Sequence, residues 1–314
     1  MQFRAIPHSQ LKVSSVAVGT WAIGGSHWGD VNDRDSEAAI VRALDLGVNL
    51  VDTAPVYGAG HAEEVVGRAI KGRRRQEIIL STKCGLRIDE RNRRCLKADS
   101  IAFEIGASLK RLGTDVIDIL FCHWPDKDTP IEETVQALAR ERDAGRIRAF
   151  GLSNHPPELI ERAAAAGPLS CLQEHYSLLS RGIEKSVLPV AAKHGLAVLA
   201  YAPLGGGILT GKYRTPPSFA GRDVRDFFYP FYKEPLWSRT QELLAVMRAV
   251  AERRNASVGQ VAIAWAAARP AVASALVGAK NPSQAADNTV GGGLALSADD
   301  LRDLTAASDK ALAQ

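Results

Sequence analysis

The sequence predicts an α/β protein whose parallel sheet closes into a barrel, and three observations support this fold class. Short apolar runs rich in β-branched residues alternate with longer segments of helical period along the chain. Eight such runs occur, and no change in composition separates them. The length of 314 residues also suits an α/β barrel, which routinely exceeds about 250 residues as one unit. We therefore expect a (β/α)8 TIM barrel that forms a single domain over residues 1–314.

The eight predicted strands are apolar and short, as expected for strands that are covered by helices. They span residues 15–18, 48–51, 77–81, 116–121, 147–152, 169–173, 197–200 and 273–277. Side chains that can cap a helix N-terminus begin four of the intervening segments, at Thr129, Ser238, Ser257 and Asn281. Glycines suited to the left-handed end of a helix precede four of the strands, at Gly47, Gly113, Gly145 and Gly195.

Two segments are additional to a plain barrel. Residues 2–13 alternate polar with apolar side chains on either side of a turn, which predicts an N-terminal hairpin at the bottom of the barrel. Residues 203–237 are rich in Gly, Pro and aromatic residues and show no clear period. Loops of this length in compact domains are usually functional lids or disordered, so we expect a long lid loop here.

Composition narrows the class of protein. The net charge of +4 gives no case for nucleic-acid binding and would not repel an anionic cofactor. Four cysteines show neither CxxC nor metal-ligand spacing, so we expect no metal and reduced thiols in the cytoplasm. The N-terminus lacks the apolar region of a leader peptide, and no stretch approaches about 18 consecutive apolar residues, so we expect no membrane segment.

Four polar residues lie just beyond three of the predicted strands: Asp52 and Tyr57, Lys83, and His123. Because parallel strands of a barrel end on one face, these residues should meet there although they are distant in sequence. Each has a structural interpretation when taken alone: a helix cap, pocket packing, a surface amine and a buried histidine. Their joint placement instead favours a site that protonates a carbonyl oxygen, and therefore carbonyl reduction.

The chemistry of these four residues is consistent with that function. A phenol has a pKa of about 10, and a nearby ammonium group lowers it. We expect Lys83, anchored by Asp52, to lower the pKa of Tyr57 in this way. His123 would donate a second hydrogen bond to the substrate oxygen, which would stabilise the developing alkoxide.

Residues after the later strands are candidate cofactor contacts. Ser153, Asn154 and Gln173 can hydrogen-bond a carboxamide, and Tyr201 offers a ring on which a nicotinamide can stack. The glycine-rich run 205–212 and the helix start at 278–281 could bind phosphates, although the glycine run alone is more typical of a flexible loop. Neither GxGxxG after a strand nor GxxxxGK[ST] occurs, so the two commonest nucleotide-binding folds are not indicated.

Six motifs in a fixed order resemble those of the aldo-keto reductases over nearly the whole chain. They are GTWAIGG at 19–25, DTAPVYG at 52–58, STK at 81–83, HWPD at 123–126, GRIRAFGLSN at 145–154 and GAKNPSQAADN at 278–288. The opening motif and HWPD are similar to the bacterial branch that includes inositol-operon reductases and related sugar or aldehyde reductases.

The resemblance implies roles for individual residues. Tyr57 would be the general acid, Lys83 and Asp52 would tune it, and His123 would orient the carbonyl group of a small-molecule substrate. NAD(P)H would lie extended over the C-terminal face of the barrel. Implied cofactor contacts are Thr20, Trp21, Asp52, Ser153, Asn154, Gln173 and Tyr201 near the nicotinamide, Leu204, Gly206, Leu209, Gly211 and Lys212 near the pyrophosphate, and Gly278, Lys280, Gln284, Asp287 and Asn288 near the adenosine.

The choice between NADPH and NADH depends on a few positions. The family usually prefers NADPH, and many members have a lysine and a serine where this chain has Gly278 and Ala279, and an arginine in place of Gln284. Lys212 and Lys280 are then the remaining candidates to pair with a 2′-phosphate. We expect NADPH, with NADH as the alternative.

The substrate pocket is predicted to be aromatic. Together with Tyr57 and His123, its walls should include Trp21, Trp28, Trp124, His155 and Tyr176, with Phe227, Phe228, Tyr229, Phe231 and Tyr232 from the long loop. The loop aromatics could equally pack on one another or form a subunit contact. Such a pocket suits sugars, polyols, aryl aldehydes or bulky ketones, and the sequence leaves the oligomeric state open.

Two other functions remain as alternatives. Some proteins with this barrel are cofactor-binding regulatory subunits of membrane channels, although no docking extension is evident at either end of this chain. Lys83 could instead form a Schiff base, although the neighbouring Asp52 argues against this.

Overall fold

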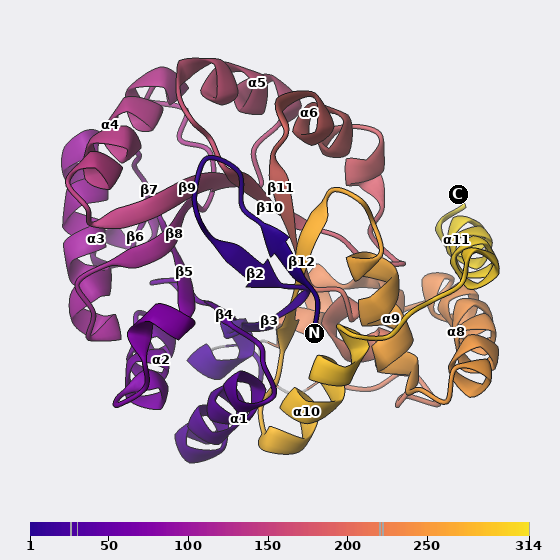
Figure 1. Cartoon of the computed structure of the whole chain (residues 1–314). Coiled ribbons are helices and arrows are strands. Elements are labelled where there is room, and N and C mark those ends of the chain that lie inside the picture. Colours follow the sequence, from indigo (N-terminus) through magenta and orange to yellow (C-terminus); the bar gives the residue numbers. More distant parts are fainter. Residues whose placement is uncertain (26, 30, 220, 222, 314) are drawn as a thin grey trace.

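Eight parallel strands close into a barrel in the computed structural model, which describes residues 1–25, 27–29, 31–219, 221 and 223–313. Figure 1 shows the chain winding around this barrel from strand to strand. The order around the barrel is β10-β11-β12-β3-β4-β5-β8-β9. The strands are β3 Val16–Gly19, β4 Leu50–Asp52, β5 Ile79–Cys84, β8 Ile117–Cys122, β9 Ile147–Ser153, β10 Cys171–His175, β11 Ala197–Tyr201 and β12 Val272–Gly278. All eight predicted strands are confirmed, and the TIM barrel with them.

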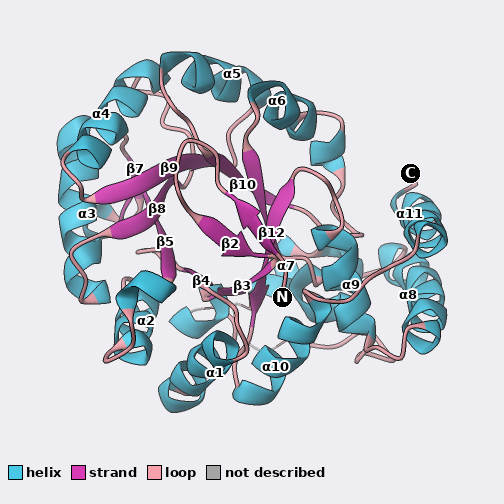
Figure 2. Cartoon of the chain, in the orientation of Figure 1, coloured by secondary structure: helices cyan, strands magenta, loops and turns pink. Residues whose placement is uncertain are grey.

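Helices form a layer around the outside of the sheet (Figure 2). They are α1 Asp33–Asp45, α2 His61–Ile70, α3 Ala98–Leu112, α4 Ile131–Asp143, α5 Pro157–Ala166, α6 Val187–His194, α8 Leu236–Arg253, α9 Val258–Ala267, α10 Pro282–Gly291 and α11 Ala298–Leu312. Among the described residues, no helix combines the length and the apolar character that crossing a membrane requires.

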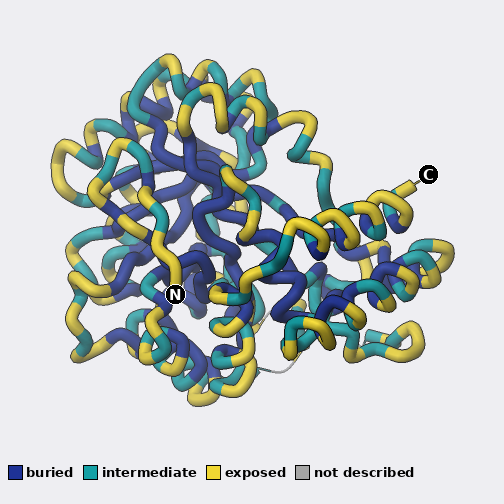
Figure 3. Tube along the Cα trace, turned by 45° about the vertical axis from the view of Figure 1, so that its right-hand side comes forward, coloured by how far each residue is buried: buried dark blue, intermediate teal, exposed yellow. Residues whose placement is uncertain are grey.

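Buried residues divide into two layers because alternate side chains of each strand point inward and outward. Leu50, Ile119 and Phe121 belong to the barrel interior, whereas Val51 and Leu120 face the helices. Figure 3 shows the buried residues concentrated in the middle of the molecule and the exposed residues along its outer turns. Burial of each such side chain contributes roughly 1.5–3 kcal/mol, so this alternation fixes the strand register.

The predicted N-terminal hairpin is confirmed. β1 Phe3–Ala5 pairs antiparallel with β2 Lys12–Ser14. Ile6, Leu11 and Val13 are buried and join the inner cluster of the barrel, so the hairpin covers one end of its core.

Two of the four predicted helix caps are confirmed. Ser257 and Gln260 form a reciprocal capping box at α9, and Asn281 accepts a hydrogen bond from the backbone N–H of Gln284 at α10. The other two predictions are wrong. Thr129 donates its hydroxyl to Asp126 at 2.7 Å instead of capping α4, and α8 begins at Leu236, which places Ser238 inside its first turn.

The long segment at 203–237 contains more regular structure than the lid loop predicted there. It includes η5 Gly205–Thr210, α7 Val224–Phe228 and η6 Pro230–Tyr232. The backbone N–H of Val224 donates to the carbonyl of His27 at 2.7 Å, which ties α7 to the loop after β3. Single helical turns are too short to show a period in the sequence. Residues 220 and 222 of the predicted loop lie outside the described residues.

Replacement of Glu104 by Gln should change how stability depends on pH. Glu104 is 5% exposed, and burial raises its pKa to about 7. An unfolded chain loses this proton near pH ~4.3, whereas the folded protein keeps it until about pH 7. Stability should therefore fall between these two pH values by roughly 3 kcal/mol, and Glu104→Gln should remove this part of the fall.

Urea unfolding at pH 5 and pH 8 measures this effect. Glu64 lies exposed on α2, so Glu64→Gln is the matched control and should follow the unsubstituted protein. Parallel pH profiles for the Glu104→Gln variant and the unsubstituted protein would contradict the assigned pKa.

Candidate active site

A cavity of about 510 Å³ opens at the carboxyl ends of the barrel strands. It brings together residues near or beyond the carboxyl ends of all eight barrel strands, as expected for this face of a barrel. Of the predicted site residues, those that line it are Thr20, Trp21, Trp28, Asp52, Tyr57, His123, Trp124, Ser153, Asn154, Gln173, Tyr201, Leu204, Gly206, Lys212, Gly278, Lys280 and Gln284.

Lys83 is not part of the cavity lining but lies buried beside Tyr57. It is 1% exposed and donates to Asp52 Oδ2 and to the carbonyl of Thr53, each at 2.8 Å. Asp52 Oδ1 accepts from Ser81 Oγ at 2.7 Å and from Gln173 Nε2 at 2.8 Å. Every charged atom of this ion pair is therefore hydrogen-bonded, which a buried pair requires. Asp52 ends β4 and lies opposite Ser81 of β5, two residues before Lys83, so strand register brings Asp52 and Lys83 together.

Tyr57 is held above this ion pair by a tight turn after β4. The turn packs against η1 Trp21–Gly24, where a Cβ on Gly58 would lie 2.2 Å from the carbonyl oxygen of Gly24. Only glycine fits at Gly58, whose φ of 65° also disfavours a side chain. The ring centroid of Tyr57 lies 5.0 Å from Lys83 Nζ and 6.0 Å from the ring centroid of His123.

The polar ends of Tyr57 and His123 are available to a ligand. Within the part of the chain that the structure describes, neither the Tyr57 hydroxyl nor the His123 imidazole makes a hydrogen bond to another protein group. Both residues are partly exposed and line the cavity. Two unpaired polar groups that face one space can bind the same atom of a substrate.

Our expectation that Lys83 lowers the pKa of Tyr57 is wrong. Burial, and then the charge of Asp52, raise that pKa well above its usual value. The negative charge of the Asp52 carboxylate offsets the positive charge of Lys83. Burial also lowers the pKa of Lys83 itself. The phenol is therefore fully protonated at neutral pH and keeps its proton for a substrate.

His123 is neutral at the same pH. Burial, and then the charge of Lys83, hold its pKa well below the usual value. A neutral imidazole carries one N–H, so it can donate a hydrogen bond without competing with Tyr57 as an acid.

A hydrogen-bonded chain continues from His123 toward the predicted nicotinamide contacts. Asn154 Nδ2 donates to the His123 carbonyl at 3.1 Å and to Ser153 Oγ at 3.0 Å. The Tyr201 hydroxyl donates to Asn154 Oδ1 at 2.9 Å, and Ser153 Oγ donates to the Gln173 carbonyl at 2.8 Å. These residues thus form one connected group beside the proposed catalytic pair.

The part of the cavity beside the glycine-rich run 205–212 has the features of a dinucleotide groove. Gly206 and Gly207 have φ of 69° and 101° and line the cavity with Lys212. A Cβ on Gly206 would lie 2.8 Å from the ring of Tyr229, so only glycine leaves the backbone in this position. A backbone free of side chains, one aromatic platform and two lysines fit an extended anionic dinucleotide.

Four predicted cofactor contacts are not among the residues that line the cavity. Leu209 is fully buried, and Gly211 packs against Val258. Asp287 accepts from Gln260 Nε2 at 2.7 Å, and Asn288 donates to the Gly278 carbonyl at 3.1 Å.

The predicted aromatic wall is only partly present. Phe227, Phe228 and Tyr229 line the cavity together with the three tryptophans. Our assignment of His155 and Tyr176 to the pocket is wrong, because both are buried and neither lines it. Phe231 and Tyr232 do not line it either, and Tyr232 packs on Tyr213 and Phe219, in agreement with the alternative of packing within the loop.

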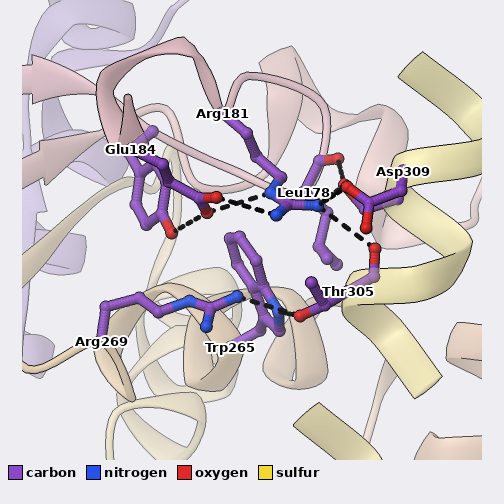
Figure 4. A network of polar contacts seen from close by, with 9 residues as sticks. Leu178, Arg181, Glu184, Trp265, Arg269, Thr305 and Asp309 are labelled. Carbon is purple, nitrogen blue, oxygen red and sulfur yellow. Dashed lines mark hydrogen bonds and ion pairs between the residues drawn. The ribbon is translucent and has the colours of Figure 1, made fainter. Parts of the chain in front are cut away.

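Tyr176 belongs to a different site in the fold. Its hydroxyl donates to Glu184 at 2.6 Å, and its ring packs against Trp265. Figure 4 shows Glu184 and Trp265 in a network with Arg181 and Arg269, which joins η4 Gly182–Glu184 to α9 and α11.

Sequence reasoning also missed several cavity residues. His27, Val56, Leu86 and Arg225 line the cavity, and they come from loops or from elements of two to five residues, which are too short to show a periodic pattern. Val56 and Leu86 lie close in sequence to Tyr57 and Lys83, which is the one signal that could have found them.

Comparisons with known proteins agree with this geometry. The model of the aldo/keto reductase family matches residues 15–309. Aldo-keto reductase YhdN from Bacillus subtilis is 38% identical over 97% of this chain and 92% of its own length. The NADH-specific methylglyoxal reductase of Escherichia coli is 33% identical over 89% of this chain and 90% of its own length. A probable voltage-gated potassium channel subunit beta of Arabidopsis thaliana is 33% identical over 92% of this chain and 90% of its own length.

A solved structure extends the match to three dimensions. The glycerol dehydrogenase AKR11B4 from Gluconobacter oxydans superposes with a TM-score of 0.89 at 35% identity, covering 99% of this chain and 96% of that one. Sequence and fold therefore agree, and the chain belongs to the aldo/keto reductase family.

Proposed function

We propose that Tyr57 is the general acid of this NAD(P)H-dependent oxidoreductase, which reduces an aldehyde or ketone to an alcohol. One observation carries the proposal. Tyr57 and His123 lie together on the cavity wall beside the buried Lys83–Asp52 ion pair, and among the described residues neither the hydroxyl nor the imidazole has a hydrogen-bond partner.

Each residue has one task in the reaction. The cofactor, when bound, supplies the hydride that adds to the carbonyl carbon. The neutral His123 imidazole and the Tyr57 hydroxyl hold the carbonyl oxygen by hydrogen bonds. Tyr57 transfers its proton to that oxygen as negative charge develops there, and it regains a proton from solvent. Lys83 stabilises the transient phenolate, so its charge acts during the reaction and not on the resting phenol.

The buried position of Lys83 disfavours the Schiff-base alternative. An amine that attacks a carbonyl needs access to it, whereas Lys83 Nζ is enclosed and bound to Asp52 and to the Thr53 carbonyl. The names of two relatives support the regulatory-subunit alternative, but a cavity with Tyr57 and His123 on its wall favours the enzyme.

We further propose NADPH as the preferred cofactor, because Lys212 and Lys280 both line the cavity and could pair with a 2′-phosphate. One relative is named as NADH-specific, so NADH is the competing choice. We also propose that residues 1–314 act as one domain in the cytoplasm.

A panel of carbonyl compounds, followed at the absorbance of reduced nicotinamide with each cofactor in turn, tests these proposals. We expect turnover with aldehydes and a lower KM for NADPH than for NADH. Absence of turnover with every carbonyl compound, together with co-purification with a membrane channel, would support the regulatory alternative instead.

A further inference from the structure

A short hairpin borders the cavity beside the proposed catalytic pair. β6 Leu86–Arg87 pairs antiparallel with β7 Arg93–Arg94, and Leu86 lies opposite Arg94. Leu86 lines the cavity, and so does Trp124, which directly follows His123 in the chain. The hairpin therefore stands where a substrate would extend once its carbonyl group has reached His123.

The hairpin and its flanks carry an excess of positive charge. Residues 86–97 contain five arginines and lysines and two carboxylates. Both carboxylates already have partners: Asp89 accepts from Arg87 at 2.7 Å, and Glu90 accepts from Arg93 at 2.6 Å. A net positive rim of this kind attracts anions.

Arg94 is the cation of this hairpin that lies against the pocket wall. Its guanidinium sits over the ring of Trp124, 5.3 Å from the centroid. Among the described residues, it forms no hydrogen bond or ion pair with any carboxylate. The nearby acid Asp126 is fully engaged with the N–H groups of Leu96 and Asp128 and with the Thr129 hydroxyl.

The positive charge of Arg94 also affects a buried residue nearby. Together with the larger effect of burial, its charge lowers the pKa of His155, which follows β9. Arg94 itself is exposed and reaches the cavity through Trp124, whereas Arg225 is the arginine among the described lining residues, and Asp223 binds it through two hydrogen bonds of 2.6 and 2.8 Å. Arg94 therefore differs from Arg225 in having no acidic partner.

We propose that Arg94 binds a carboxylate or phosphate on the far end of the substrate, so that the enzyme prefers carbonyl compounds that carry a negative charge. The proposal rests on the function proposed above. It assigns Trp124 the role of a wall along which the body of the substrate lies, and Arg94 the role of a charged partner at the end of that wall. A guanidinium suits either anion because its N–H groups match two oxygens at once.

A matched set of aldehydes tests this selectivity. The substrates are 4-carboxybenzaldehyde, 4-formylphenyl phosphate and the neutral 4-nitrobenzaldehyde. For Arg94→Ala we expect kcat/KM to fall at least fivefold, about 1 kcal/mol, for one or both anionic substrates and to change less than twofold for the neutral one. Arg94→Lys should recover part of the loss. The anion with the larger loss identifies the group that Arg94 recognises.

Arg93→Ala is the control, because Arg93 lies on the same strand but is paired with Glu90. It should affect all three substrates equally and weakly. Equal losses for charged and neutral substrates in Arg94→Ala would overturn the proposal and leave Arg94 with only a packing role. Unchanged kinetics in that variant would also overturn it. Failure of the unsubstituted protein to reduce any of the aldehydes would instead count against the proposed function.

Discussion

Replacement of Tyr57 by Phe is expected to lower kcat by about 10³-fold or more, because a positioned general acid contributes about 10²–10⁴ to a rate and the neighbouring donors cannot replace its proton. Among the described contacts, the Tyr57 hydroxyl has no protein partner, so the variant should fold with unchanged stability. Cofactor affinity should also stay nearly constant, since the ring remains in place. Single-turnover rates and cofactor titration measure the two effects separately.

Tyr176→Phe is the matched control for that substitution. It removes a tyrosine hydroxyl that hydrogen-bonds Glu184 away from the cavity. We expect a loss of roughly 1 kcal/mol in stability and no change in turnover. Wild-type turnover in Tyr57→Phe would show that another group protonates the substrate.

Replacement of Lys83 by Met should be damaging in two ways. It leaves the buried Asp52 carboxylate without its cation, which typically costs about 3–5 kcal/mol of stability. It also removes the charge that stabilises the phenolate, so kcat should fall strongly even in the fraction that folds. Chemical denaturation and active-site-normalised turnover report these two losses.

The double variant Asp52→Asn and Lys83→Met separates the two effects. Removing both charges should restore part of the stability, because no unpaired ion remains in the core. Turnover should stay low, since the phenolate still lacks its cation. Lys193, which pairs with Glu161 at the surface, provides the control: Lys193→Met should cost less than about 1 kcal/mol. A double variant with full activity would contradict the role given to Lys83.

The fold could be predicted because its signals are local. Strands such as β8 and β9 are uninterrupted apolar runs, and the residues after them converge by the geometry of any parallel barrel. The same rule brought Asp52 and Tyr57 to His123. Local signals failed where two local hydrogen bonds compete for one side chain: the Thr129 hydroxyl donates to Asp126, three residues earlier, and the predicted cap at α4 is lost.

The environment of each site residue could not be predicted in the same way. The pKa of Tyr57 depends on the distances from its hydroxyl to Asp52 and Lys83, and the sequence contains the charges of these two residues but not their separation. Tyr176 follows a strand in the sequence yet points to the network at Glu184, because side chains alternate along the chain and one residue changes the face. The burial of each site side chain, and the direction in which it points, could therefore be learned only from the structure.

The most direct measurement is a crystal structure of the protein with oxidised cofactor and a non-reactive carbonyl ligand. The account predicts that the carbonyl oxygen lies about 3 Å from both the Tyr57 hydroxyl and a ring nitrogen of His123, with Lys83 still paired to Asp52. A carbonyl oxygen bound elsewhere in the cavity, beyond the reach of Tyr57, would contradict it.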